Sequence, residues 1–161
     1  MSKERDAKTL FGTMCRTLDN MNWTYKTETT DGFYIIRTSA VGEDLSMGLV
    51  IRIDINRALM YLKSPMPFSV PESKRAELGA ATVIANMAML NGCFEYDYSD
   101  GYCAFKLIIP FEECTISEKV CKYMIYVSCD MVDKFNDKMK ALAEGNISLS
   151  EYNQQVRSMF G

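Results

Sequence analysis

The sequence predicts an α+β domain in which helices pack against an antiparallel sheet of about five to six strands. Stretches whose apolar residues recur every three or four positions alternate with stretches in which they recur every second position. The strand-like stretches also come in consecutive pairs around short turns, which is typical of antiparallel hairpins. We expect a single domain over residues 1–161, with the element order α-β-β-β-β-α-β-β-α-α.

The first helix is expected over residues 7–18. Its apolar positions recur at steps of three and four and therefore share one face: Ala7, Leu10, Phe11, Met14 and Leu18.

A hairpin is expected next, around Asp31-Gly32, a dipeptide that accepts positive φ. Its strands cover residues 23–28 and 33–38. The register stays open at this point. The tightest turn places Lys26 opposite Arg37, whereas a loop two residues longer places Glu28 there.

Residues 46–55 alternate between apolar and polar positions and predict a half-buried strand. If Asn56-Arg57 is the turn that follows, the apolar faces of this strand and the next agree. The pairs predicted by this turn are Ile51 with Leu62, Ile53 with Met60 and Ile55 with Ala58.

A second helix is expected to begin at Ser69, which with Glu72 forms a capping-box pattern, and to stop at Asn91-Gly92. Small residues near its middle should let it approach the sheet closely. Its predicted inner stripe is Ala76, Ala80, Val83, Met87 and Leu90.

The clearest hairpin surrounds Asp100-Gly101, and we expect a two-residue turn there. A slip by one residue would bring apolar side chains opposite charged ones. The predicted pairs are Phe94 with Leu107, Glu95 with Lys106, Tyr96 with Phe105 and Tyr98 with Cys103.

The longest helix is expected to begin at a capping box over Thr115 to Glu118 and to end near Ala143. Its apolar band is unusually wide, because two stripes lie side by side. One stripe contains Val120, Met124, Val127, Met131, Phe135, Met139 and Leu142. The other contains Cys121, Ile125, Cys129 and Val132. A short helix over residues 148–159, capped by Ser148 and Glu151, forms a C-terminal extension over residues 146–161.

Residues from about Val70 to Gly145 resemble the YbjN family, bacterial proteins often described as sensory transduction regulators. The segments that carry the resemblance are Val70-Pro71-Glu72, Lys74 to Leu78, Asn86, Gly92, Phe94 to Gly101 and Phe105-Lys106. The resemblance implies the architecture of class I type III secretion chaperones, which are commonly homodimers. The methionine- and cysteine-rich third helix and the segment after Gly145 depart from the family pattern.

The charges of the chain exclude some classes of partner. The 18 basic and 21 acidic residues are interspersed without a basic block, which disfavours nucleic-acid binding. Charged residues interrupt the N-terminal stretch, and the longest uncharged run, residues 78–94, is broken by Gly and Asn. We therefore expect neither a signal peptide nor a membrane span, and we expect a cytoplasmic protein with reduced cysteines.

The residue types also argue against catalysis. There is no histidine, so mixed zinc sites are excluded and a cysteine nucleophile would lack its usual base. The glycine-rich phosphate loops and the serine-hydrolase elbow are missing. Glu95, Asp97 and Asp100 form the one tight acidic cluster, which we interpret as strand-face and turn residues. We expect no enzyme activity, no cofactor and no metal.

The wide apolar band of the third helix suggests a noncatalytic protein-interaction module, chaperone-like or regulatory. Its binding surface would lie on the sheet or on the third helix, and its protein partner is not identified by the sequence. The partner-binding residues expected on the third helix are Cys121, Met124, Ile125, Ser128, Cys129 and Val132. We expect a homodimer, or a monomer ordered against a partner, unless the first helix or the C-terminal helix covers the second stripe. The alternative is a small-molecule sensor whose ligand lies between the sheet and the third helix.

Overall fold

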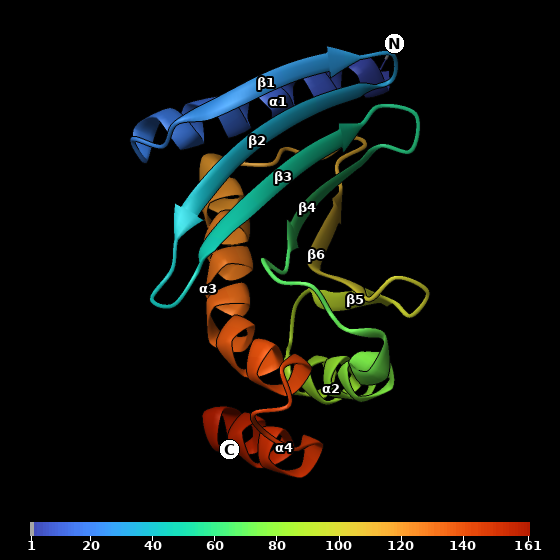
Figure 1. Ribbon diagram of the computed structural model, residues 1–161. Helices are drawn as coiled ribbons and strands as arrows, with labels where there is room; N and C mark the ends of the chain where they lie inside the picture. The colour runs from blue at the N-terminus through green and yellow to red at the C-terminus, as the bar shows by residue number, and fades with distance from the viewer. Residues whose placement is uncertain (1) are drawn as a thin grey trace.

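The computed structural model describes residues 2–161, which form a six-stranded antiparallel sheet and four α-helices (Figure 1). This confirms the predicted α+β class and element order. The helices are α1 (Ser2–Asn20), α2 (Arg75–Ala88), α3 (Glu118–Ala143) and α4 (Leu149–Phe160), and a 3₁₀ turn, η1 (Glu72–Lys74), precedes α2. The strands are β1 (Tyr25–Thr30), β2 (Phe33–Val41), β3 (Ser46–Asp54), β4 (Leu59–Pro65), β5 (Cys93–Asp97) and β6 (Tyr102–Pro110).

The strand order in the sheet is β1-β2-β3-β4-β6-β5, so β6 lies between β4 and β5. Helices α1 and α3 pack on one face of this sheet: α1 contacts β2 and β3, and α3 contacts β3, β4 and β6. In Figure 1 both helices lie behind the strands, and no helix of the described residues crosses the front of β1 to β4. We call this front surface the uncovered face. Among residues 2–161, none of the helices combines the length and apolar character that a membrane span needs.

The core fills the space between the sheet and its helices. Alternate residues of the strands point into this space, as the period of two in their sequences predicts. The strand residues buried there include Ile36, Leu49, Ile51, Ile53, Met60, Leu62, Phe105 and Leu107. The first helix buries the apolar face that the sequence predicted, with Ala7, Leu10, Met14 and Leu18.

The first two hairpins have the registers that the shorter turns predicted. Lys26 lies opposite Arg37, so the tight turn at Asp31-Gly32 is the correct alternative, and Gly32 has a φ of 80°. In the second hairpin the predicted pairs Ile51 with Leu62 and Ile53 with Met60 are present, whereas Ile55 and Ala58 lie in the turn of residues 55–58 and do not pair as strand residues.

The predicted register of the third hairpin is wrong by two residues. Phe94 lies opposite Phe105 rather than Leu107, and Tyr96 lies opposite Cys103. The strands are joined by residues 98–101 rather than by two residues. This longer loop closes on Asp97, whose backbone oxygen accepts from the Gly101 nitrogen at 2.8 Å. A shift of two residues leaves every side chain on its predicted face, so the alternation could not reveal it.

Two of the three predicted helix caps are also corrected. Ser69 does not cap α2, because the 3₁₀ turn comes first and neither of these two elements has a side-chain N-cap. Helix α3 is capped by Ser117, which accepts from the Val120 nitrogen, and not by Thr115. The capping box of Ser148 and Glu151 on α4 is present as predicted.

Replacement of Gly101 by valine should destabilise the fold by about 1 to 3 kcal/mol. Gly101 has a φ of 79°, and a Cβ atom there would lie 2.9 Å from the Cβ of Val70. The free energy of unfolding, measured by chemical denaturation, checks this. Gly48→Val is the matched control, because a Cβ at Gly48 meets nothing within 4 Å. Equal denaturation midpoints for the two variants would contradict the placement of Gly101 at a turn position that requires positive φ.

Candidate functional site

The six residues of α3 expected to bind a partner lie mostly in the core. Of these, only Cys129 is partly accessible, and the others are at most 1% exposed: Cys121, Met124, Ile125, Ser128 and Val132. Ser128 donates to the Met124 carbonyl within the helix, at 2.8 Å. In this conformation the buried five cannot contact another protein, so the accessible surface has to be sought elsewhere.

Helix α1, one of the two elements that the sequence left as candidates, packs beside the N-terminal part of α3, where the second apolar stripe begins. The two helices pack together, and polar contacts join their ends. Arg16 Nε lies 3.2 Å from Glu118 Oε1, and Asn20 Nδ2 donates to Glu118 Oε2 at 3.0 Å. Of this stripe, Cys121, Ile125 and Val132 are buried within the single chain, and Cys129 is partly accessible.

The predicted inner stripe of α2 is wrong, because this helix is rotated so that its small residues face inward. Its buried residues are Leu78, Ala81, Thr82 and Ala85. Two sets of hydrogen bonds fix the rotation. Asn86 Oδ1 accepts from the Phe94 nitrogen at 2.7 Å, and the Tyr96 hydroxyl donates to the Arg75 carbonyl at 2.9 Å.

The rotation leaves large apolar side chains of α2 and of the segment that follows it in water. Val83, Met87 and Leu90 are 63%, 83% and 107% exposed, and Phe160 of α4 lies beside them. A depression of about 580 Å³ between α2 and α4 is lined in part by Val83, Met87 and Phe160. Soluble proteins seldom leave such side chains together in water without a function, so this α2–α4 surface is one candidate contact area.

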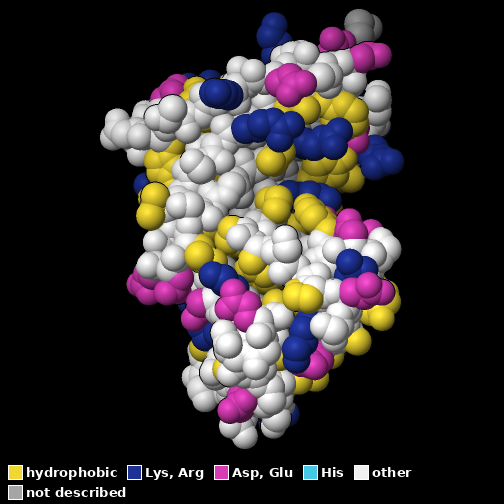
Figure 2. All heavy atoms as spheres, viewed as in Figure 1, with side chains coloured by type: hydrophobic (Ala, Val, Ile, Leu, Met, Phe, Trp, Pro, Cys, Tyr) yellow, Lys and Arg dark blue, Asp and Glu magenta, His cyan; other side chains and the backbone are white. Residues whose placement is uncertain are grey.

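A second candidate area lies on the uncovered face, where four cationic residues share one row across the sheet. Cross-strand neighbours in this row are Lys26 of β1, Arg37 of β2, Val50 of β3, Lys63 of β4 and Lys106 of β6. At about 4.8 Å between strands, the row spans about 19 Å. We call Lys26, Arg37, Lys63 and Lys106 the cationic row. Figure 2 shows Lys and Arg side chains gathered with hydrophobic ones over this part of the sheet.

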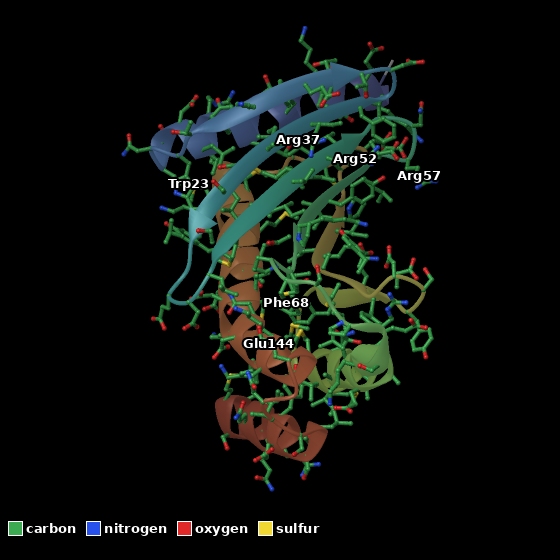
Figure 3. The ribbon with its side chains drawn as sticks, in the orientation of Figure 1. Trp23, Arg37, Arg52, Arg57, Phe68 and Glu144 are labelled. Carbon is green, nitrogen blue, oxygen red and sulfur yellow. The ribbon has the colours of Figure 1, made fainter. Side chains whose placement is uncertain are left out.

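Arg52 of β3 adds a fifth positive charge beside the cationic row. Its guanidinium lies 4.3 Å from the ring centroid of Phe33, a cation–π contact. Figure 3 shows Arg37, Arg52 and Arg57 spread over β2, β3 and the turn that follows β3. Next to them the sheet is hollowed by a depression of about 550 Å³, lined in part by Arg52, Tyr61 and Lys106.

Glu95 partly neutralises the row at one end. Lys63 and Lys106 lie directly opposite one another, which alone would be repulsive, and Glu95 forms ion pairs with both. Burial raises the pKa of Glu95, but the hydrogen bonds from Lys63 and Lys106 outweigh it and hold this pKa below its usual range. The other end differs: in the described residues, no carboxylate lies within 4.0 Å of the cationic group of Lys26, Arg37 or Arg52.

Asp54 is the buried acid of this face, at 3% exposure. Its carboxylate accepts from the Arg57 nitrogen at 2.9 Å and from the Tyr61 hydroxyl at 2.7 Å. Burial raises the pKa of Asp54, but these hydrogen bonds outweigh it and lower the pKa below its usual range. The carboxylate therefore stays charged and holds Arg57 and Tyr61 in place.

A third depression, of about 490 Å³, lies between the sheet and α3. Its walls include Trp23, Met47 at the start of β3, and Tyr126 and Val127 of α3. We call it the Trp23 groove. Asp133 of α3 joins the β2–β3 loop beside it, because its Oδ1 accepts from the Glu43 nitrogen at 2.9 Å.

Three thiols and the acidic residues of the third hairpin are held by burial or by local hydrogen bonds. Burial raises the pKa of the Cys103 thiol to about 12 and those of Cys121 and Cys129 to about 11, so these thiols are poor nucleophiles. Asp97 accepts from Ser99, and Asp100 accepts from the Tyr102 nitrogen, as expected for turn residues. Within residues 2–161, no group of three or more Cys, Asp or Glu side chains is arranged to hold a metal ion.

Sequence reasoning missed the cationic row. Arg37, Lys63 and Lys106 each stand at a polar position of an alternating strand, and this was the available signal. The row itself depends on the pairing of β4 with β6, two strands that are not consecutive in the chain.

Comparison with known protein families and with curated proteins found no match.

Acidification should destabilise the wild type more than the Asp54→Asn variant. A carboxyl whose folded-state pKa is lowered stabilises the fold above its unfolded pKa, and this contribution is lost as pH falls through the folded-state pKa. The free energy of unfolding, measured from about pH 5 to about pH 2, should fall more steeply for the wild type. Asp44→Asn, which removes an exposed loop carboxylate, should keep the wild-type slope. If the free energies of unfolding of wild type and Asp54→Asn fell equally with pH, the lowered pKa of Asp54 would be contradicted.

Proposed function

We propose that the protein is a noncatalytic polypeptide-binding module, chaperone-like or regulatory, whose partner offers an acidic segment to the uncovered face. The observation that carries the proposal is the cationic row. It places positive charges on four strands of a face that no helix of the described residues covers across β1 to β4.

The electrostatics favour an anionic partner. Among residues 2–161, no carboxylate lies within 4.0 Å of the cationic groups of Lys26, Arg37 and Arg52, although the chain as a whole has a net charge of -3. Positive charge gathered on one face of an acidic protein attracts and orients an oppositely charged partner. Phe33 and Tyr61 add half-buried apolar area beside these charges.

The same face favours a polypeptide over nucleic acid. Base stacking uses open aromatic rings, and the Arg52 guanidinium already covers one side of the Phe33 ring, which leaves Tyr61 as the other ring beside these charges. Glu28, Asp54 and Glu95 also lie on this face and would repel a continuous line of phosphates. Carboxylates spaced along a peptide can avoid these acidic positions.

Further features support the proposal. The protonated thiols and the absence of histidine from the sequence favour a noncatalytic role. The exposed α2–α4 surface is of the kind that contacts other proteins. We include kinship with the YbjN family and a cytoplasmic location in the proposal. The kinship rests only on the resemblance of residues 70–145.

An acidic peptide with glutamate at alternate positions should bind the protein, and added salt should weaken the binding. Arg37→Ala should weaken it about fivefold at low ionic strength, because one exposed charge contact is lost. Fluorescence anisotropy of the labelled peptide measures both effects.

Lys8→Ala is the matched control, because it removes one exposed positive charge from α1, on the other side of the sheet. The same peptide with glutamine in place of glutamate should bind much more weakly. Equal binding of the two peptides, or tighter binding of a single-stranded oligonucleotide, would contradict an acidic polypeptide as the partner.

The Trp23 groove favours a second candidate function, that of a small-molecule sensor. The groove lies between the sheet and α3, and its walls are mainly apolar. An apolar ligand of drug size suits a depression of this volume.

For that second function, titration with a medium-chain fatty acid should change the fluorescence of Trp23, the single tryptophan of the chain. Met47→Asp should abolish the change, since it introduces into the wall of the groove a charge of the same sign as the fatty-acid carboxylate. Met87→Asp, on the α2–α4 surface, should preserve it. A fluorescence that stays constant at saturating fatty acid would exclude this class of ligand.

A further inference from the structure

β1 is an edge strand whose outer side is open. It pairs with β2 alone, and residues 26–30 are all exposed; in Figure 1 no strand lies along its outer edge. An edge of this kind presents unpaired backbone groups to any strand that approaches.

The register of the first hairpin fixes which backbone groups point outward. Residues that flank a two-residue turn form a hydrogen-bonded pair, and the pairs then alternate along the strands. Thr30, Glu28 and Lys26 therefore bond to β2, whereas Thr29, Thr27 and Tyr25 direct their N–H and C=O groups outward. The Ile55 nitrogen donates to the Gly32 oxygen at 3.0 Å, which agrees with this alternation on the other side of β2.

A second copy of β1 can pair antiparallel with this edge in a register that its own charges select. The outward groups allow Lys26 to face Lys26, Glu28 or Thr30 of the second copy, in three successive symmetric registers. The first sets two lysines opposite one another, and the third sets Glu28 against Glu28 of the second copy. The middle register pairs Lys26 with Glu28 twice and Thr27 with Thr27, and all of these pairs are favourable.

We infer that β1 is the docking strand for a second copy of this chain. The product is a twofold-symmetric dimer in which one sheet runs through both copies, joined by the outward backbone groups of Tyr25, Thr27 and Thr29. Lys26 and Glu28 face each other at non-hydrogen-bonded positions, where opposed side chains come closest. The uncovered faces of the two copies then lie on the same side of the joined sheet. The dimer therefore presents a binding surface larger than that of one copy.

Sedimentation of the full chain across a dilution series, without any peptide, tests the inference. The wild type should pass from dimer to monomer on dilution. Lys26→Glu should weaken the dimer by about tenfold, because it opposes carboxylates at both symmetric positions. Glu28→Lys should do the same, and the double variant Lys26→Glu with Glu28→Lys should restore the dimer, because it reverses both charges together.

Thr27→Pro removes an outward N–H without changing any charge or any bond to β2, and should abolish the dimer. Denaturation midpoints show that each variant is folded. Because the cationic row is intact in Thr27→Pro, its binding of the acidic peptide separates failure of the dimer from failure of the proposed function. A wild type that stays monomeric at every concentration, a double variant that fails to dimerise, or an unaffected Thr27→Pro dimer would overturn the inference.

Discussion

The burial of α3 along one face of the sheet is the constraint on which the rest of the structure depends. Ile125 and Val132 are fully buried, and α1 also packs against this helix. With both helices on this face, the opposite face of β1 to β4 is left in water. A half-covered antiparallel sheet has to alternate apolar and polar positions, and this places Arg52 outward between Ile51 and Ile53. The charged surface is therefore a direct consequence of where the core lies.

Periodicity and turn chemistry predicted the helices and strands, but they did not predict the register of the third hairpin. Asp31-Gly32 fits a two-residue turn and set the first hairpin. Asp100-Gly101 has the same signature, yet the Asp97 carboxylate accepts from both the nitrogen and the hydroxyl of Ser99 and stabilises a longer loop. Local side-chain hydrogen bonds of this kind compete with the tight turn. Because side chains alternate with a period of two, a shift of two residues leaves the apolar pattern of the strands unchanged.

The surfaces were harder to predict than the elements, because a helix stripe does not say what covers it. The apolar band of α3 is wide because the helix packs against the sheet and also against α1, α2 and α4. On α2 the larger apolar residues suggested the inner face, but contacts of Asn86 and Tyr96 turned the small residues inward. The cationic row required the order of all the strands, which depends on long-range pairing that no local pattern encodes.

The partner is proposed to meet the uncovered face and not α3, and backbone amide chemical shifts recorded during titration with the acidic peptide test this most directly. The amides of Lys26, Arg37, Arg52 and Lys106 should shift with saturation, while those of Ile125 and Val132 stay in place. Shifts concentrated on α3, or on Val83 and Met87 with the sheet unchanged, would contradict the assignment of the binding surface.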